Sequence, residues 1–513
     1  MATRVVPNPV TDSVVAALER ALGQEKVLTD FGARVARTRV PAPFPVHRFA
    51  DHMPDVVVLP ESAEEVSAVL RIANEYRVPV VPRAGGTGLA DGAVPLHKGI
   101  LLDIKKMNKI LDLDLVNRTV TVQPGLNMLK LNEFLAPYGV FYPDDPASYP
   151  VSIIGGRIGT SGWSLIGARY GHTRDLVISL QVVLPTGEIV RLADGGGAPK
   201  VRKASTGYNL KQLFIGTQGT LGVVTEATLE LFPKPEAELA AFFGYESFEE
   251  AYRSTGALST SGLGTLAAVI LFDERKVEYL RRDDEAYIPL PERIKAVVAT
   301  ALYGVEEEVR AAAQRLHRIA KETGGEYLGD ELSAGDWASR HDRYATPLHG
   351  RLPDGTVVPM SWHCEDAAII YSELPAIKQK WHEITDRYIQ KYGIFDNWGM
   401  FFYSNNPYKG WGDYLVEIDI GIWEQALNEE TWQAWVNLKR EITRATLEHQ
   451  GSISACHGAC REGDAEFIPV EMSEGGFELM KRIKRLLDPN NILNPSKNYL
   501  HLAYVDEEMG GAS

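Results

Sequence analysis

The stretch at residues 62–88, SAEEVSAVLRIANEYRVPVVPRAGGTG, decides the fold. It begins with a serine N-cap followed three residues later by a glutamate, and its apolar residues recur at helical spacing, so we expect a helix over residues 62–75. The β-branched run at 78–81 predicts a strand. Further strand-like runs at 56–59 and 100–104 flank the stretch, and this alternation indicates α/β units.

Three glycine-rich segments follow or precede predicted strands. They are RAGGTG at 83–88, GGRIGTSG at 155–162 and GTQGTLG at 216–222, and the last two adjoin expected strands at 177–184 and 222–231. Glycine allows a ligand to approach the main chain closely, and successive exposed N–H groups bind anions. None of the three matches the dinucleotide fingerprint G-x-G-x-x-G or the P-loop. Together they predict a binding site for a long ligand that carries a diphosphate.

The chain changes character after residue 235. In residues 236–455 glycine becomes rarer, and expected helices at 305–321 and 374–392 alternate with β-like runs such as 266–272. The final segment, 456–513, contains an amphipathic helix that stops at an Asp-Pro-Asn-Asn sequence. We therefore expect an α+β protein with domains at 1–235 and 236–455 and a C-terminal segment at 456–513.

Composition narrows the classes of function and location. The 513 residues include 53 basic and 68 acidic ones, a net charge of −15, which argues against a nucleic-acid or anionic-membrane partner. The sparse cysteines Cys364, Cys456 and Cys460 indicate a reducing compartment without a disulfide framework. No apolar h-region opens the chain, and no apolar run is long enough for a transmembrane segment. We expect a cytoplasmic globular protein.

The order of these motifs closely resembles the FAD-binding domain of the vanillyl-alcohol oxidase / p-cresol methylhydroxylase flavoprotein superfamily. The match runs from about residue 50 to 235, and a tail match follows at GSISACHG (451–458) and LDPNNILNPSK (487–497). The resemblance implies a two-subdomain FAD-binding domain of the p-cresol methylhydroxylase type plus an α+β substrate (cap) domain. It also implies FAD as cofactor, FAD-linked oxidoreductase activity and, as is common in this family, a homodimer.

The resemblance implies specific cofactor contacts. Some members carry a histidine covalently linked to FAD at the position of Thr87, so we expect noncovalent FAD here. His172 is the one histidine inside the matched loops and therefore the remaining candidate for a covalent link. The residues expected to hold the diphosphate are Arg83, Ala84, Gly85, Gly86, Thr87 and Gly88. Those expected along the ribityl and flavin side are Pro146, Ser148, Ile154, Gly155, Gly156, Thr160, Gly162 and Gly171. Gly222 and Val224 are expected near the adenine, and Asn494 and Lys497 near the flavin ring.

Catalytic candidates come from the tail and the cap domain. His457 matches the histidine of the family's His-Gly pair, and a pKa near neutrality suits a base that takes a proton from an alcohol. The cresol-type branch holds a phenolate with tyrosines, for which the candidates here are Tyr403, Tyr408 and Tyr414. His363, in WHCED (362–366), lies in a segment resembling the pocket-shaping Glu-Asp segment of the 2-hydroxy-acid branch.

The 2-hydroxy-acid branch carries a metal-binding pattern, His-x-Gly-Asp-Gly-Asn-x-His, and a glutamate before its His-Gly pair. This chain has NWGMFF (397–402) at the first place and Cys456 at the second, so we expect no metal. A substrate anion would then need another cation, such as Arg343, Arg461 or Lys497.

Three functions follow from the resemblance. The leading one is an FAD-dependent oxidoreductase that removes a hydride from the CH–OH carbon of an alcohol or 2-hydroxy acid. The first alternative is an oxidase of a para-substituted phenol or benzylic alcohol that acts through a quinone methide. The second is a flavin-dependent transferase resembling alkyl-dihydroxyacetone-phosphate synthase. The sequence leaves the electron acceptor open among oxygen, a quinone, a cytochrome and another partner.

Overall fold

The computed structural model describes most of the chain. The described residues are 8–42, 46–194, 198–282, 290–342, 349–351, 357–359, 361–405, 412–459 and 462–504. Four residues named above lie outside them: Tyr408, Arg343, Cys460 and Arg461.

A four-stranded sheet forms around the stretch that decides the fold. Helix α3 (Ala63–Tyr76) packs on this sheet beside α1 (Asp12–Leu22) through a core of valine and leucine side chains. The predicted helix and strand are thus confirmed to within two residues. The order of the sheet is β1 (Val27–Leu28), β2 (Val56–Val58), β4 (Ile100–Asp103) and β3 (Val80–Arg83), the last three parallel.

The start of α3 differs from the expected capping box in one respect. Ser62 Oγ accepts the N–H of Glu65 at 3.3 Å. The Glu65 carboxylate accepts the N–H of Glu61 at 2.8 Å rather than that of Ser62. The Ser62 hydroxyl and the Glu65 carboxylate each still accept a backbone N–H at the helix start. The Ser-x-x-Glu pattern therefore locates the start of the helix correctly.

A five-stranded antiparallel sheet follows, and one glycine-rich segment there is helical. Residues 155–160 belong to α5 (Ile154–Thr160), a short helix that ends at Ser161 in the left-handed conformation. The glycine-rich segment 155–162 is therefore helical over most of its length. A Cβ on Gly155 would lie 3.0 Å from Pro124 O, so its glycine permits close packing. The sheet order is β5 (Ile110–Asp114), β6 (Thr119–Val122), β10 (Val223–Glu230), β8 (Val177–Val183) and β9 (Ile189–Ala193).

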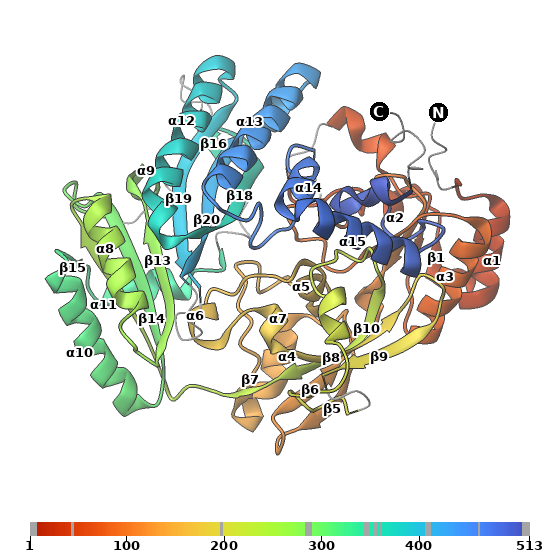
Figure 1. Ribbon diagram of the computed structural model, residues 1–513, viewed down its shortest axis with the longest axis horizontal. Coiled ribbons are helices and arrows are strands. Elements are labelled where there is room, and N and C mark those ends of the chain that lie inside the picture. The colour runs from red at the N-terminus through yellow and green to blue at the C-terminus, as the bar shows by residue number, and fades with distance from the viewer. Residues whose placement is uncertain are drawn as a thin grey trace.

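A seven-stranded sheet forms the second half of the fold (Figure 1). Its strands in spatial order are β15 (Glu326–Tyr327), β12 (Ala237–Tyr245), β14 (Ala296–Gly304), β13 (Leu266–Phe272), β19 (Phe395–Ser404), β20 (Asp413–Ile422) and β18 (Ser361–Ile370). One face packs against α8 (Phe248–Ser259), α10 (Glu306–Glu322), α12 (Leu374–Tyr392) and α13 (Glu429–Glu448). The other face meets α6 (Gly167–Tyr170), so one sheet surface is available to border a site with the first half.

This arrangement confirms the expected α+β fold. The domain boundaries at 235 and 455 stay a proposal. The remaining helices and strands are α2 (Phe31–Val35), α4 (Met128–Leu135), α7 (Thr173–Leu176), α9 (Glu274–Arg282), α11 (Asp330–Ala338), α14 (Ile468–Glu471), β7 (Val140–Phe141), β11 (Phe232–Pro233), β16 (His349–Arg351) and β17 (Val357–Pro359). Among the helices of the described chain, none combines the length and apolar character that a membrane span needs.

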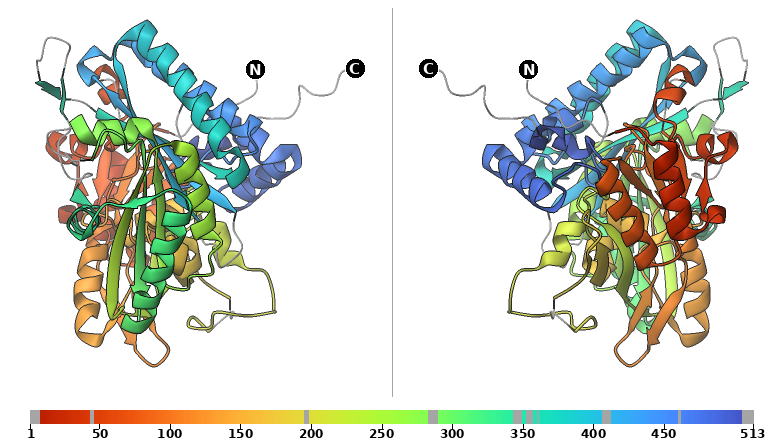
Figure 2. Two further views of the ribbon diagram at one scale, coloured as in Figure 1. Left: turned by 90° about the vertical axis from the view of Figure 1, so that its left-hand side faces the viewer. Right: turned by 90° about the vertical axis from the view of Figure 1, so that its right-hand side faces the viewer.

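The C-terminal segment returns to the first sheet (Figure 2). After α15 (Ser473–Leu487), Val80 of strand β3 donates its N–H to Ile492 O at 2.7 Å, and Val80 O accepts the N–H of Asn494 at 2.8 Å. Lys484 is fully buried and donates to Asp488 at 2.5 Å and to the carbonyls of Thr220 and Leu493. The tail therefore extends the edge of the sheet and is fixed by a buried ion pair.

Replacing Lys484 by methionine is expected to lower the free energy of unfolding by about 3–5 kcal/mol, because Asp488 would stay buried without its cation. Urea unfolding followed by circular dichroism measures the change. A Lys380→Met variant removes an exposed lysine in α12 and should stay within about 0.5 kcal/mol of the wild type. Equal free energies of unfolding for the two variants would show that the Lys484–Asp488 ion pair does not contribute to stability.

Candidate active site

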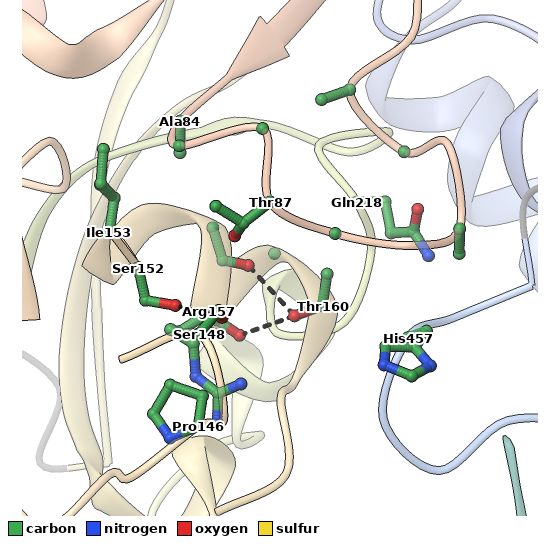
Figure 3. Close-up of a pocket in the computed structure, with 18 of the residues that line it drawn as sticks. Ala84, Thr87, Pro146, Ser148, Ser152, Ile153, Arg157, Thr160, Gln218 and His457 are labelled. Atoms are coloured by element: carbon green, nitrogen blue, oxygen red, sulfur yellow. Dashed lines mark hydrogen bonds between the residues drawn. The ribbon is translucent and has the colours of Figure 1, made fainter. Parts of the chain in front are cut away.

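A cavity of about 300 Å³ lies between the glycine-rich segments and the face of the seven-stranded sheet that meets α6. Most residues expected to hold the cofactor line it. They are Arg83, Ala84, Gly85, Gly86, Thr87, Gly88, Pro146, Ser148, Gly155, Gly156, Thr160, Gly222 and Val224. Figure 3 shows Thr87, Thr160 and His457 among the residues that line this cavity.

Five of the expected cofactor residues do not line the cavity. Lys497 is fully buried and donates to Asp91 O at 2.7 Å. Ile154 is buried in the apolar core, and a Cβ on Gly162 would meet the Arg157 guanidinium. Gly171 lies against Asp175. Asn494 donates to the carbonyls of Gly92 and Gln218, so it holds two wall segments together. Direct cofactor contact by these five residues is therefore not supported.

The first glycine-rich segment has the properties of a phosphate cradle. The N–H groups of Gly86, Thr87 and Gly88 donate no hydrogen bond to any residue that the structure describes. Gly88 lines the cavity, and a Cβ there would have no protein atom within 4 Å, so any side chain would occupy the space meant for the ligand. Gly86 has φ +68°, which other residues rarely adopt. These features fit the diphosphate of FAD.

Two buried arginines fix the walls. Arg83 lies beneath the cradle and donates to Arg39 O at 2.9 Å, and its burial lowers the pKa of the guanidinium. Arg157 donates two hydrogen bonds to Asp144, at 2.6 and 3.2 Å. Both guanidinium groups are thus held by protein partners, and both residues contribute to the lining of the cavity.

His172 is engaged in structural contacts. Its Nδ1 accepts the N–H of Ser164 at 3.1 Å, and its Nε2 lies 2.8 Å from Asn405 Oδ1. The ring centroid lies 4.0 Å from that of Trp163, and burial lowers the pKa of the ring. His172 does not line the cavity, so the expectation of noncovalent FAD stays in place.

His457 lines the cavity and is oriented by Asp366 of β18. Its Nδ1 lies 2.8 Å from Asp366 Oδ1, and Asp366 Oδ2 accepts the N–H groups of Ala455 and Cys456, each at 2.7 Å. Burial opposes ionisation of Asp366, but the charge and hydrogen bond of His457 and the two N–H groups hold the pKa of the carboxyl below its ordinary value. One buried carboxylate therefore positions both the loop and the ring.

The same contacts change the expected chemistry of His457. Burial disfavours the charged ring, but attraction by Cys456 and Asp366 outweighs it and holds the pKa of His457 well above its ordinary value. These contacts favour the protonated ring. The role of His457 as a base stays a prediction.

The strands supply side chains that sequence reasoning missed. Leu415 and Glu417 alternate along β20 on the cavity side, and Trp362 joins them from β18. Burial raises the pKa of Glu417 to about 7, with Asp419 and Asp366 adding to the shift against His457. The alternation of β20 is the signal that could have found Glu417, but only once the register of the sheet is known.

The cap-domain candidates separate by sheet face. Tyr403 lines the cavity. Tyr414 lies in the opposite core, where its hydroxyl is 2.8 Å from Ser259 Oγ. His363 also faces away, with its Nε2 2.8 Å from Glu365 and its ring edge against Trp435. Contact between the substrate and Tyr414 or His363 is therefore not supported, whereas Tyr403 stays a candidate.

The comparisons agree with this geometry. Residues 54–193 match the family described as FAD binding domain, and residues 234–498 match FAD linked oxidases, C-terminal domain. A glycolate oxidase subunit GlcD from Bacillus subtilis is 33% identical over 87% of this chain and 89% of its own. A mitochondrial D-lactate dehydrogenase [cytochrome] from Arabidopsis thaliana is 30% identical over 92% of this chain and 78% of its own.

Two solved structures share the fold. A p-cresol methylhydroxylase with substrate bound has a TM-score of 0.76 at 20% identity and covers 96% of this chain and 98% of its own. A 4-ethylphenol oxidase from Gulosibacter chungangensis has a TM-score of 0.77 at 20% identity, with 96% and 99% covered. The likeness extends over both halves of the molecule.

Proposed function

Because this chain belongs to the FAD-linked oxidases of the vanillyl-alcohol oxidase / p-cresol methylhydroxylase superfamily, and is thus an FAD-dependent oxidoreductase, we propose that it removes a hydride from the CH–OH carbon of a small alcohol or 2-hydroxy acid. The observation that carries this proposal is the buried Asp366–His457 pair, which directs the imidazole ring into the cavity that the phosphate cradle also lines. Bound FAD supplies the hydride acceptor.

His457 has a definite task in this proposal. Oxidation of the CH–OH group releases the hydroxyl proton as well as the hydride. Glu417, whose pKa is raised to about 7, would accept that proton while the His457 ring hydrogen-bonds the substrate oxygen. Asp366 fixes the ring orientation through Nδ1. Trp362, Tyr403 and Leu415 form an apolar and aromatic wall that excludes water from the reacting carbon.

The sequence relatives favour a hydroxy acid, since two of them carry the names glycolate oxidase and D-lactate dehydrogenase. A specific observation keeps the phenol alternative: Trp362 and Tyr403 line the reactive end, and Glu417 adds a carboxyl that would repel a substrate carboxylate. We propose the CH–OH oxidation as the first function and oxidation of a para-substituted phenol as the second.

Anaerobic mixing of the FAD-loaded protein with glycolate, D-lactate, vanillyl alcohol and 4-ethylphenol tests the proposal. We expect at least one CH–OH compound to bleach the flavin absorbance, because hydride transfer produces reduced flavin. Bleaching by 4-ethylphenol alone would favour the phenol alternative. If dithionite reduces the flavin and none of the four compounds does, the proposal fails, and an acyl-dihydroxyacetone phosphate then tests the transferase.

We further propose that the enzyme acts in the cytoplasm, which the few cysteines favour. Its electron acceptor is a second substrate, and re-oxidation of bleached protein by oxygen, a quinone or a cytochrome identifies the class.

A further inference from the structure

We propose that a divalent metal ion of the Zn²⁺ type binds at the reactive end of the cavity, with Cys364, Glu417 and His457 as its protein ligands. These residues come from β18, β20 and the loop before residue 458, so no sequence motif unites them. In the described chain they are the one group of three or more His, Cys, Asp and Glu side chains whose ligand atoms lie within 4.8 Å of one another.

The spacing is close to that of a zinc site. Zn–S and Zn–N distances of about 2.3 and 2.0 Å place ligand atoms roughly 3.5 Å apart in a tetrahedral site. The ligand atoms, which lie within 4.8 Å of one another, therefore need to approach by no more than about 1.3 Å, which rotamer adjustment supplies. Thiol, carboxyl and imidazole together favour Zn²⁺ or Co²⁺ over the hard cations Mg²⁺ and Ca²⁺, which prefer oxygen ligands alone.

Cys364 and His457 are held in place by the surrounding structure. Cys364 is 2% exposed, and its thiol has one weak contact, 3.8 Å to Glu365 O. His457 Nδ1 lies 2.8 Å from Asp366 Oδ1, so a metal would bind through Nε2. A carboxylate on the second nitrogen is the usual outer partner of a metal-binding histidine.

Charge at the site favours a cation. Asp366, Glu417 and Asp419 lie on the same face of two neighbouring strands. Lys276 Nζ pairs with Asp419 at 2.6 Å, and His457 pairs with Asp366. Among the described residues no lysine or arginine lies within 4.0 Å of Glu417 in an ion pair. A divalent ion would bring a positive charge to this carboxyl.

Three protein ligands leave a fourth position open. Glu417 and His457 line the cavity, so that position faces the substrate space, as in catalytic zinc sites. This inference rests on the function proposed above and deepens it, since the ion would take the place of a proton on His457 Nε2 and would polarise the substrate oxygen. Binding of the metal does not depend on which substrate is oxidised.

The experiment loads the purified, FAD-containing protein with Zn²⁺ or Co²⁺, removes excess ion on a desalting column and counts metal by mass spectrometry. We expect one ion per chain. The Co²⁺ form should show ligand-field absorption at wavelengths longer than the flavin bands. Cys364→Ser and Glu417→Gln should each weaken binding by at least about 100-fold. Their FAD content and circular dichroism confirm that they fold.

The matched control is Glu373→Gln. Glu373 also contacts a histidine, His449 Nδ1 at 2.7 Å, but lies outside the cavity, so this variant should still bind one ion. Wild-type protein that retains less than about a tenth of an ion per chain, or equal binding by all three variants, would overturn the proposal. Metal-free protein whose flavin is still bleached by a CH–OH compound would then leave the oxidation intact. One bound ion without any bleaching would refute the oxidation and keep the metal.

Discussion

A Gly88→Val variant is expected to fold normally and to bind FAD at least about 100-fold more weakly than the wild type. A Cβ at this position meets no protein atom within 4 Å, so the fold tolerates the side chain. The valine would instead occupy the space beside the N–H groups of the cradle, where the phosphates must approach closely. Loss of about 3 kcal/mol of binding energy corresponds to this factor. Flavin absorbance per protein after desalting, and titration of apoprotein with FAD, measure the effect.

The matched control is Gly264→Val. Gly264 likewise has no atom within 4 Å of an added Cβ and has an ordinary φ, but it does not line the cavity. This variant should keep its full flavin content. Retention of FAD by Gly88→Val at wild-type affinity would show that residues 83–88 do not hold the diphosphate, and the assignment of the cavity would have to be abandoned.

The second large effect is expected for Asp366→Asn. The asparagine amide cannot accept all the N–H groups that the two carboxylate oxygens now accept, and it removes the negative charge beside His457. The ring would lose its orientation and part of its positive charge. We expect flavin reduction by the best substrate to slow by about 10²–10⁴-fold, the range of proton-handling groups in catalysis. Anaerobic stopped-flow absorbance measures the rate constant.

Asp273→Asn serves as the comparison. Asp273 is an equally buried carboxylate whose Oδ2 lies 2.6 Å from a histidine, His382 Nε2, yet neither residue lines the cavity. Both variants should lose stability, because each disturbs a buried hydrogen-bonded pair. Only Asp366→Asn should lose rate. Equal losses of rate in the two variants would mean that Asp366 acts through stability alone.

Much of the first half of the fold could be predicted from local signals. The helix at 62–75 has an N-cap, an amphipathic period and a strand on each side, and all of these agree with its final environment. The helical segment at 155–162 was not predicted, because glycines favour a loop locally, whereas here they allow α5 to pack against Pro124 and Ile104. That packing is tertiary and leaves no trace in the segment itself.

The site was predictable where a motif surrounds the residue. His457 stands in a recognisable His-Gly pair, and the cradle in a glycine-rich run. Tyr403 and Tyr414 could not be distinguished, because their faces depend on the pairing of Ser404 with Tyr414 across β19 and β20. Adjacent residues of a strand point to opposite faces of the sheet. A shift of the register by one residue would therefore move each side chain from the cavity face to the core face, or the reverse. Glu417 was missed for the same reason.

The return of the tail to strand β3 bears on how the living cell makes this flavoprotein. Asn494 joins the carbonyls of Gly92 and Gln218, and these segments wall the cofactor cavity. Residues more than 400 positions apart must therefore meet before the pocket closes. A nascent chain that ends at residue 490 lacks these hydrogen bonds, so we expect cofactor capture to follow translation of the tail.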